Sequence, residues 1–258
     1  MSLLQDKVVL VSGGTQGVGA AVARAAAGAG AAVAVTGRRP EPGNALVDEL
    51  RGAGARALYV PCDVADVAAV RTAVSTVLAE YGRVDSLVNA AGLTSRGTLL
   101  DTTPELFDEH IAINLRGPFF LMQAVVADML ARQAPGTIVN IISTSELGGQ
   151  PYLAPYVAAK AGLAGLTRNV AHAHRWDRIR INGLDIGWTD TEGEDATQRA
   201  FHGAEDGWRE RAGKSLPMGK LGQADEIAEF VVFLLSDRSG VVTGSILDWD
   251  QNVFGGLD

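Results

Sequence analysis

The feature that most constrains the fold is an alternation between short Val/Ile-rich runs and longer segments with helical spacing. Seven apolar runs recur along the chain, at residues 7–13, 31–37, 57–62, 86–92, 136–143, 179–187 and 245–250. Between them, segments such as 67–81 and 224–236 repeat their apolar residues with a helical period. Continuously apolar strands that alternate with helices form a parallel sheet covered on both faces. The sequence therefore predicts a doubly wound α/β fold of about seven strands, with ligands at the carboxyl ends of the strands.

The organisation of the chain points to one domain over residues 1–258, because no linker or low-complexity tract marks a boundary. Two long helices are expected in the middle, at about 104–132 and 155–177. A polar, Gly-punctuated stretch at about 188–222 follows the sixth strand. Long connections of this kind are often lids or binding loops, so we interpret it as a substrate loop. The alternative is a helical surface insertion without a role.

Composition excludes several classes of function. The net charge of -8 disfavours a nucleic-acid partner, because binding phosphates needs a basic surface. Cys62 is the only cysteine, so the chain can form neither an internal disulfide nor a thiolate metal cluster, and we expect no metal site. The N-terminus lacks a basic leader region and no apolar run is long enough for a membrane span. We therefore expect a cytoplasmic protein without a membrane partner.

A strand, a Gly-rich turn and an Ala-rich helix follow one another in "VVLVSGGTQGVGAAVARAA". Gly13, Gly17 and Gly19 give the spacing G-x3-G-x-G, which is related to the commoner dinucleotide fingerprint G-x-G-x-x-G without being identical to it. Glycines let the backbone approach a pyrophosphate, and the following helix offers unpaired N–H groups and the positive end of its dipole. After the first strand of an alternating α/β chain, this turn predicts a dinucleotide site.

The end of the second strand bears on which dinucleotide binds. An acidic residue there favours NAD, whereas an arginine accommodates the 2′-phosphate of NADP. The chain reads Gly37-Arg38-Arg39, and the first carboxylate is Glu41, beyond a proline. Guanidinium groups bind phosphate through two parallel hydrogen bonds, so Arg38 is the first candidate and Arg39 the second. NADP is predicted and NAD is less favoured; two solvated loop arginines are the alternative.

A phenol and an ammonium stand four residues apart in the apolar stretch "LAPYVAAKAGLAGL". Tyr156 and Lys160 share one face of the predicted helix. Because a nearby ammonium favours the phenolate, we expect Lys160 to lower the pKa of Tyr156 toward the working range of a proton shuttle. Ser143 follows the fifth strand and can hold the same substrate oxygen. Asn114 is interpreted as a residue that breaks or polarises the long helix and anchors a water near the lysine.

Taken together, these motifs resemble the single-domain type of the short-chain dehydrogenase/reductase family over essentially the whole chain. Its T-G-x3-G-x-G pattern is present as "SGGTQGVG", its N-A-G-G-like motif as "NAAG" and its Y-x3-K motif as Tyr156 and Lys160. The resemblance implies a Rossmann-like, NAD(P)-binding enzyme in which Tyr156 is the acid/base and Ser143 orients the substrate. It further implies that Lys160 lowers the pKa of the tyrosine and binds the nicotinamide ribose, that Asn114 holds a relay water, and that the protein is a homotetramer.

The cofactor site is expected to draw on the glycine turn and on residues at the ends of successive strands. Asp63 can accept a hydrogen bond from an adenine amino group, and the small residues after Asn89 leave room for a flat cofactor; caps or turns are the alternative. The full predicted set is Gly13, Thr15, Gln16, Gly17, Val18, Gly19, Arg38, Arg39, Asp63, Val64, Asn89, Ala90, Gly92, Tyr156, Lys160, Gly187, Thr189 and Thr191.

Two departures from the family pattern stand out. Ile186 precedes Gly187 where the family has Pro-Gly, and we expect the loss of the fixed φ of proline to loosen the backbone there. Near the C-terminus, Trp249, Asp250 and Gln251 replace glycines that the family commonly has, so these side chains are candidates for lining the pocket of this or a neighbouring subunit.

The sequence thus predicts an NADP(H)-dependent oxidoreductase that interconverts a secondary alcohol and a carbonyl compound. Carboxylates in the 188–222 stretch, together with Asp250 and Gln251, favour a hydroxylated substrate such as a sugar or polyol. These carboxylates are Asp190, Glu192, Glu194 and Asp195. A reductase of a hydrophobic ketone and a non-catalytic NADP-binding sensor of the same fold are the alternatives. His172 and His174, two residues apart on a helix, point in different directions and are interpreted as surface residues.

Overall fold

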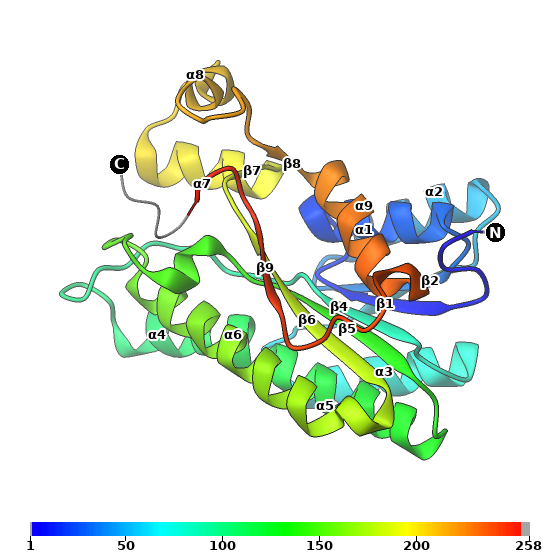
Figure 1. Cartoon of the computed structure of the whole chain (residues 1–258). Helices are drawn as coiled ribbons and strands as arrows, with labels where there is room; N and C mark the ends of the chain where they lie inside the picture. The colour runs from blue at the N-terminus through cyan, green and yellow to red at the C-terminus, as the bar shows by residue number, and fades with distance from the viewer. Residues whose placement is uncertain (1, 254–258) are drawn as a thin grey trace.

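A seven-stranded parallel sheet forms the centre of the protein, seen here in a computed structural model that describes residues 2–253. The strand order is β3-β2-β1-β4-β5-β6-β9 (Figure 1). The strands are β1 (Val8–Ser12), β2 (Ala32–Gly37), β3 (Ala57–Pro61), β4 (Ser86–Asn89), β5 (Gly136–Ile141), β6 (Ile179–Ile186) and β9 (Ile246–Trp249). All seven coincide with the apolar runs of the sequence, and the predicted doubly wound α/β fold is confirmed.

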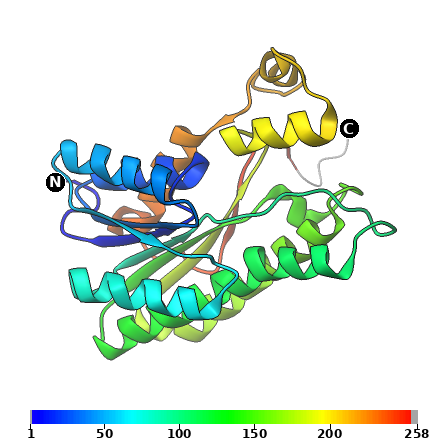
Figure 2. The same ribbon diagram turned by 180° about the vertical axis from the view of Figure 1, so that it is seen from behind.

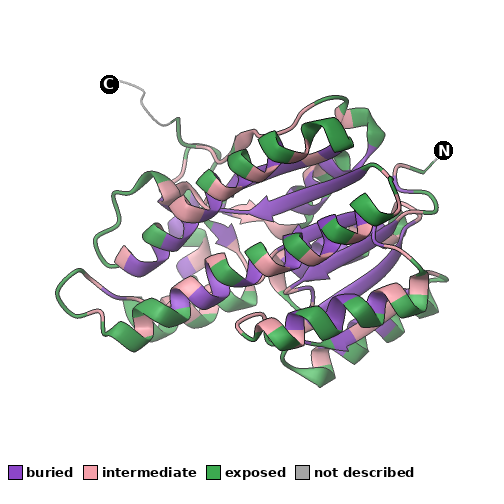
Figure 3. Ribbon diagram, turned by 90° about the horizontal axis from the view of Figure 1, so that it is seen from below, coloured by how far each residue is buried: buried purple, intermediate pink, exposed green. Residues whose placement is uncertain are grey.

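Helices cover both faces of the sheet, as Figures 1 and 2 show from opposite sides. One face packs against α1 (Gly17–Gly28), α2 (Pro40–Gly52) and α9 (Ala224–Leu235). The other face packs against α3 (Val67–Tyr81), α5 (Gly117–Ala131) and α6 (Ala154–His174). Strands with apolar side chains on both sides are therefore buried along most of their length, while the helices are exposed on their outer sides (Figure 3).

The sheet reverses its strand order at β1, which lies between β2 and β4. In register, Ser12 at the end of β1 pairs with Thr36 of β2 and with Asn89 of β4. The glycine turn after β1, the arginines after β2 and the small residues after β4 consequently leave the sheet side by side. Such a reversal is where open α/β sheets bind ligands.

The predicted helix at 104–132 is interrupted. It consists of α4 (Pro104–Ile111), a π-helical turn at Ala112–Arg116 and α5, whose second residue is Pro118. Pro118 has no N–H for the carbonyl of Asn114, four residues earlier, so the α-helical ladder cannot pass through this point. The irregular turn includes Asn114, which the sequence suggested as a residue that breaks or polarises this helix, but Pro118 accounts for it.

Residues 188–222, the 188–222 segment, fold into a small helical unit. It contains β7 (Thr189–Asp190), α7 (Glu192–His202) and α8 (Trp208–Lys214), and β7 pairs with β8 (Gly222–Gln223). In Figures 1 and 2, α7 and α8 stand over the carboxyl ends of the strands, away from the helices that cover the sheet. No helix within residues 2–253 combines the length and the apolar character that crossing a membrane requires.

Candidate active site

The glycine turn lies directly against the chain that follows β4. Gly13 has a φ of 71°, and a Cβ placed on it would come within 2.5 Å of the Cα of Ala91. Gly17 has a φ of 52°, and the methyl group of Thr191 lies 3.4 Å from the Cβ position of Gly17. Glycine suits Gly13 because of both the positive φ and the close backbone, and it suits Gly17 because of the positive φ. Gln16 precedes α1 without capping it through its side chain, so no side chain of its own occupies the first N–H groups of α1.

These features form a cradle that fits a dinucleotide phosphate, which binds at the unpaired N–H groups of a helix N-terminus. Val18 and Gly19 begin the helix that follows the turn, and Gly19 packs against the carbonyl of Gly13. Ala90 and Gly92, from the chain after β4, border the turn from the other side; the Cβ position of Gly92 lies 3.5 Å from the Oδ1 atom of Asn114.

At the end of β2, two arginines project from the same edge. Arg38 and Arg39 are both exposed, and a guanidinium N–H of Arg39 donates to the side-chain oxygen of Gln16. Between them and the strand, Gly37 has no room for a side chain, because a Cβ there would lie 2.7 Å from the methyl group of Thr15. A side chain at position 37 would therefore require the Thr15 side chain to move, and the residue there carries no carboxylate.

Asp63 and Asn89 each have a bond within the protein. Asp63 is exposed after β3, and one of its carboxylate oxygens accepts a hydrogen bond from the backbone N–H of Ala65 at 3.0 Å, which shapes the turn before α3. Val64, beside it, packs against Gly117. The buried amide of Asn89 donates to Asn140 at 2.8 Å, and Asn140 donates to Thr167 of α6. The side chain of Asn89 thus joins two strands to α6.

Ser143, Tyr156 and Lys160 meet where α6 begins, beyond the end of β5. Tyr156 is 8 % exposed and Lys160 is 4 % exposed. The Nζ atom of Lys160 donates to the carbonyl of Ile141 at 2.7 Å and lies 5.6 Å from the centre of the Tyr156 ring. The Oγ atom of Ser143 accepts the N–H of Ser145 at 3.2 Å, the cap of the short 3₁₀ turn that follows. The structure therefore brings together three of the four predicted catalytic side chains.

The expected effect of Lys160 on Tyr156 is wrong for the chain by itself. Burial raises the pKa of Tyr156 to about 12, although the neighbouring Ser143 hydroxyl and the charge of Arg96 act to lower it. Burial also lowers the pKa of Lys160 to about 8. The physical reason is that the lysine is desolvated as fully as the phenol, and its ammonium is committed to the carbonyl of Ile141. The phenol of Tyr156 therefore keeps its proton at neutral pH.

Asn114 is held by a neighbour that the sequence did not single out, His110. The Oδ1 atom of Asn114 accepts the N–H of Leu93 at 2.9 Å, and its Nδ2 atom donates to the carbonyl of Leu93 at 3.0 Å and to Nδ1 of His110 at 3.1 Å. The other ring nitrogen of His110 faces the hydroxyl and carbonyl oxygens of Ser95. Burial lowers the pKa of His110, so the ring is neutral, and its edge faces the Tyr156 ring with the centres 6.2 Å apart.

Asp185 is a second residue that the sequence did not single out. It is 1 % exposed, on the face of β6 that points toward α6, and neither of its carboxylate oxygens has a hydrogen-bond partner among the described residues. Burial, reinforced by the charges of Glu146 and Asp248, raises the pKa of Asp185 to about 6; the Ser143 amide and Lys160 act to lower it. The alternation of inward positions along this strand is the one sequence signal that could have marked it.

The chain after β6, where the loss of proline predicts a looser backbone, is paired with β9. Ile186 is the last residue of β6 and pairs with Trp249 of β9, and the N–H of Gly187 donates to the carbonyl of Trp249 at 3.3 Å. Strand pairing thus holds the backbone where a proline would have fixed it. Further on, the hydroxyl of Thr189 donates to the carbonyl of Gly187, and the hydroxyl of Thr191 caps α7.

Most of the polar groups that suggested a sugar or polyol are bonded to the protein itself. In the 188–222 segment, Asp190 pairs with Arg209 at 2.6 Å and Asp195 pairs with both Arg199 and Arg209 at 3.0 Å. The carboxylate of Glu194 accepts hydrogen bonds from Trp188 and Gln198. Near the C-terminus, Asp250 binds the N–H of Gln251 and the amide of Asn252, and Gln251 bonds to Met218 and Lys220.

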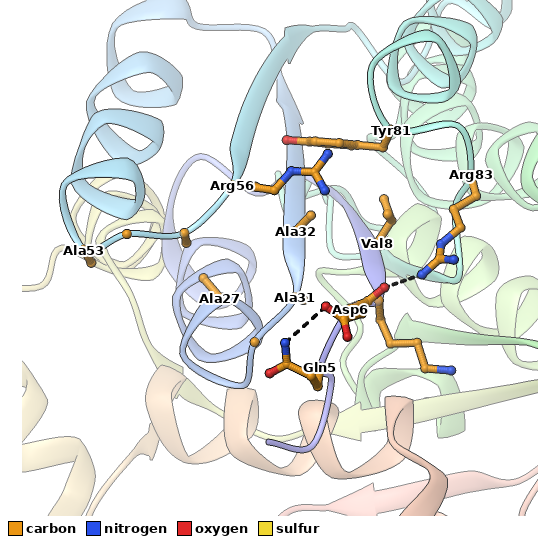
Figure 4. A pocket seen from close by; sticks show the side chains of 14 residues that line it. Gln5, Asp6, Val8, Ala27, Ala31, Ala32, Ala53, Arg56, Tyr81 and Arg83 are labelled. Atoms are coloured by element: carbon orange, nitrogen blue, oxygen red, sulfur yellow. Dashed lines mark hydrogen bonds between the residues drawn. The ribbon is translucent and has the colours of Figure 1, made fainter. Parts of the chain in front are cut away.

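A polar hollow of about 630 Å³ lies at the opposite edge of the sheet, near the amino ends of β1 and β2 (Figure 4). Figure 4 shows the guanidinium of Arg56 lying against the ring of Tyr81, 4.9 Å from its centre. Near it, a guanidinium N–H of Arg83 donates to the carbonyl of Asp6. Because none of the predicted site residues borders this hollow, the candidate active site is the carboxyl edge of the sheet. His172 and His174 lie on the outer side of α6, as expected, and His174 pairs with Asp177.

Comparisons with known proteins agree with this geometry. The family model described as enoyl-(acyl carrier protein) reductase matches residues 13–252. An uncharacterized oxidoreductase of Thermotoga maritima is 36 % identical over 246 residues, which cover 95 % of this chain and 96 % of that protein. A 3-oxoacyl-(acyl-carrier-protein) reductase of the same organism is 34 % identical, with 96 % and 97 % covered. The crystal structure of a variant of actinorhodin polyketide ketoreductase with NADPH superposes with a TM-score of 0.92 at 31 % identity, covering 99 % and 100 % of the two chains.

Proposed function

Because the chain belongs to the short-chain dehydrogenase/reductase family, and is therefore an oxidoreductase that acts on CH–OH groups with NAD(P), we propose that it is an NADP(H)-dependent enzyme that interconverts a secondary alcohol and a carbonyl compound. The observation that carries the proposal is the convergence of Ser143, Tyr156 and Lys160 beside the glycine turn, at the carboxyl edge of the sheet. The cofactor, when bound, supplies or accepts the hydride.

In this proposal, Tyr156 is the acid and base of the reaction. A pKa raised to about 12 keeps the phenol protonated at neutral pH, so it is ready to donate a proton to the oxygen of a substrate carbonyl. Ser143, whose hydroxyl lies beside the phenol, donates a hydrogen bond to the same substrate oxygen. The ammonium of Lys160 stabilises the phenolate that remains after proton transfer.

Asn114 and His110 complete the proposed proton path. Asn114 lies in the π-helical turn, where its backbone carbonyl has no α-helical donor because residue 118 is a proline, and this carbonyl can hold a relay water. The amide of Asn114 is fixed by Leu93 and His110, so it holds the turn in place rather than the water. His110 is a positioning residue in this account.

The preference for NADP over NAD is proposed from the end of β2. Arg38 is exposed beside the glycine turn, where the 2′-phosphate of the adenosine ribose would lie, and Gly37 supplies no acidic side chain that would favour NAD. Arg39 lies close by and is hydrogen-bonded to Gln16. A guanidinium stays charged at any working pH, so both groups can bind phosphate. The remaining residues of the predicted cofactor set are likewise proposed to bind NADP.

We propose that residues 1–258 form one catalytic domain in which the 188–222 segment is the substrate loop. Its position over the carboxyl ends of the strands supports this assignment (Figure 1). The single cysteine, Cys62, is buried and free, in keeping with the expected cytoplasmic location.

Self-association to a homotetramer is proposed from the outer side of the middle helices. An apolar hollow of about 540 Å³ lies between the π-helical turn, the start of α5 and the outer side of α6, bordered by Leu115, Phe119, Gly162 and Gly165. Nothing lies within 4 Å of the Cβ position of Gly165, which leaves room for close approach of another helix. Light scattering on the purified protein checks this proposal, and a monomer at micromolar concentration would contradict it.

The test of the proposed function is the oxidation of NADPH by the purified protein in the presence of a broad panel of carbonyl compounds. We expect saturable NADPH oxidation with at least one member and slower turnover with NADH. Tight NADPH binding without oxidation on any carbonyl, and without reduction of NADP on any alcohol, would instead identify a non-catalytic sensor.

A further inference from the structure

Arg96 stands at the rim of the active site in an unusual setting. It belongs to the loop between β4 and α4, and its guanidinium lies over the ring of Tyr152, 5.4 Å from the centre, and over the ring of Phe201, 6.0 Å from the centre. The imidazole of His202 completes the group and contacts the Tyr152 ring edge-on at 5.4 Å. We call Arg96, Tyr152, Phe201 and His202 the Arg96 rim. It joins three segments: the loop after β4, the chain before α6 and the end of α7.

The guanidinium of Arg96 has no carboxylate partner among the described residues. Its Nη1 atom donates to the carbonyl of Thr94 at 2.6 Å, while Nε and Nη2 both donate to the single Nε2 atom of His202, at 3.1 and 3.0 Å. The Nε and Nη2 pair is the edge of a guanidinium that binds the two oxygens of a carboxylate in parallel. In Arg96 this edge is occupied by one neutral nitrogen.

Two arginines of the 188–222 segment provide the contrast. Arg199 bonds to the carboxylates of Asp195 and Asp206, and Arg209 bonds to those of Asp190 and Asp195. The local supply of carboxylates is therefore ample, yet none of them reaches Arg96. The guanidinium of Arg96 is half-buried, lies against two aromatic rings and has a single imidazole nitrogen as acceptor at its bidentate edge. Such an arrangement is suited to binding an anion.

The position of Arg96 is fixed relative to the reacting groups. Gly97 forms a β-bridge with Leu153: its N–H donates to the carbonyl of Tyr152 at 2.9 Å, and its carbonyl accepts the N–H of Ala154 at 3.0 Å. Through its neighbour Gly97, Arg96 is therefore anchored to the chain at the start of α6, the helix that carries Tyr156. Its charge reaches the Tyr156 phenol, and it lowers the pKa of that group.

We propose that Arg96 binds a carboxylate group of the substrate, so that the enzyme acts on a small oxo acid or hydroxy acid rather than on a neutral ketone or a polyol. The inference rests on the proposed function and deepens it. The two oxygens of the carboxylate take the place of the His202 nitrogen at the Nε and Nη2 edge, and the rings of Tyr152 and Phe201 shield this pair from water. The carbonyl carbon of the same molecule then lies toward Tyr156 and Ser143.

The first experiment compares acids with their methyl esters. NADPH oxidation is measured with 2-oxobutanoate, 3-oxobutanoate and 4-oxopentanoate and with the methyl ester of each, for the wild type and for Arg96→Gln. The three acids differ in the distance between the carbonyl and the carboxylate, so one of them should fit best. For that acid, kcat/KM should exceed the value for its methyl ester. Arg96→Gln should lower kcat/KM for that acid by roughly ten- to a hundredfold more than kcat/KM for its ester, because the effect of the Arg96 charge on Tyr156 is common to both substrates.

The matched control is Arg199→Gln, which removes a positive charge from the 188–222 segment whose guanidinium already has carboxylate partners. We expect the ratio of kcat/KM for acid and ester to stay at its wild-type value in this variant. An equal fall for acid and ester in Arg96→Gln, or an acid that is no better than its ester in the wild type, would overturn the proposal while leaving carbonyl reduction intact.

A binding measurement separates this proposal from the proposed function. The protein saturated with NADP is titrated with the same acids and esters by calorimetry. Saturable binding of an acid that is lost in Arg96→Gln supports the role of Arg96 even where no carbonyl is turned over, in which case the proposed function fails. Acids that bind no more tightly than their esters would overturn the role of Arg96 whatever the turnover.

Discussion

The core of the active site and the 188–222 segment are held together by different forces. Tyr156 and Lys160 are almost fully buried, and Lys160 bonds to a backbone carbonyl of the sheet. In the 188–222 segment, Arg209 is 41 % exposed and joins its helices through ion pairs with Asp190 and Asp195. Exposed ion pairs contribute little to stability, on the order of 0–1 kcal/mol each. Burial and backbone bonds therefore fix the proposed catalytic side chains, whereas exposed ion pairs and a small separate core hold the 188–222 segment.

This difference shows how the work is divided within the domain. Proton transfer needs shifted pKa values and fixed geometry, and both follow from burial. Choice of substrate needs a surface that can adjust. The 188–222 segment can supply such a surface because it packs around a small core of its own, formed by Trp208, Ala212 and Leu221, rather than into the core of the sheet. Arg96 lies at the boundary, anchored to the rigid part through Gly97 and in contact with the segment through His202.

The largest effect is expected from the buried part. Tyr156→Phe keeps the packing and removes the proton, so kcat/KM should fall by roughly 10²–10⁴-fold or more. The affinity for NADPH should stay close to that of the wild type, because the hydroxyl is a small part of the cofactor contacts. Steady-state kinetics and fluorescence titration with NADPH measure the two quantities. Retained activity would remove Tyr156 from the mechanism and break the comparison.

Asp185 tests whether burial dominates the electrostatics of the same region. Its pKa is raised from 3.8 to about 6, so in the folded state ionisation is disfavoured. Below about pH 4 the carboxyl is neutral in both the folded and the unfolded chain, and above about pH 6 it is ionised in both, so stability is lost as the pH rises between them. The neutral variant Asp185→Asn avoids this loss.

We expect the free energy of unfolding of the wild type to fall relative to that of Asp185→Asn by about 3 kcal/mol between about pH 4 and pH 7. Urea unfolding at several pH values gives this difference, and because both forms leave a polar group buried, its change with pH is the informative quantity. A difference that is the same at every pH would show that Asp185 is not held in a desolvated site.

Arg38 lies at the carboxyl edge of the sheet, where its exposed side chain is proposed to bind the charged 2′-phosphate of NADP. The variant Arg38→Ala removes this contact. Losing a charge-assisted phosphate contact should weaken NADPH binding by roughly ten- to a hundredfold and leave NADH binding nearly unchanged. Binding titrations with both cofactors measure this. Equal losses for the two, or a wild type that prefers NADH, would contradict the assignment of the 2′-phosphate site.

The smallest effect on global stability is expected in the 188–222 segment. Arg209→Gln removes the ion pairs with Asp190 and Asp195, so proteolysis within the segment should become faster while the melting temperature of the domain stays nearly the same. Arg211→Gln is the matched control, since the hydrogen bond of Arg211 within residues 2–253 goes to the backbone carbonyl of Asp206 and not to a carboxylate. A large fall in melting temperature in Arg209→Gln would mean that the segment is part of the main folding unit.

Elements whose signal is local were predictable from the sequence. The seven strands follow from continuous apolar runs, and the irregular turn around Asn114 follows from the missing N–H of Pro118. Tyr156 and Lys160 were found because a helix brings positions four apart onto one face.

Features that depend on contacts between distant segments were not predictable. Arg96 and His202 are 106 residues apart in the chain, and no spacing rule connects them. Nothing in the sequence indicated that the carboxylates of the 188–222 segment are paired with arginines, because these pairs form only when the segment folds. The pKa of Tyr156 was misjudged for the same reason: spacing places Lys160 near it, but burial, which only the fold determines, outweighs the charge.

The central claim, that the buried part performs the chemistry and the rim selects the substrate, is tested most directly by one ratio: kcat/KM for the best oxo acid divided by kcat/KM for its methyl ester, measured in the wild type, in Ser143→Ala and in Arg96→Gln. We expect Ser143→Ala to lower both rates and leave the ratio unchanged, while Arg96→Gln lowers the ratio by roughly ten- to a hundredfold, because only the acid loses its contact with the guanidinium. A ratio that changes in Ser143→Ala, or that stays constant in Arg96→Gln, would contradict the central claim.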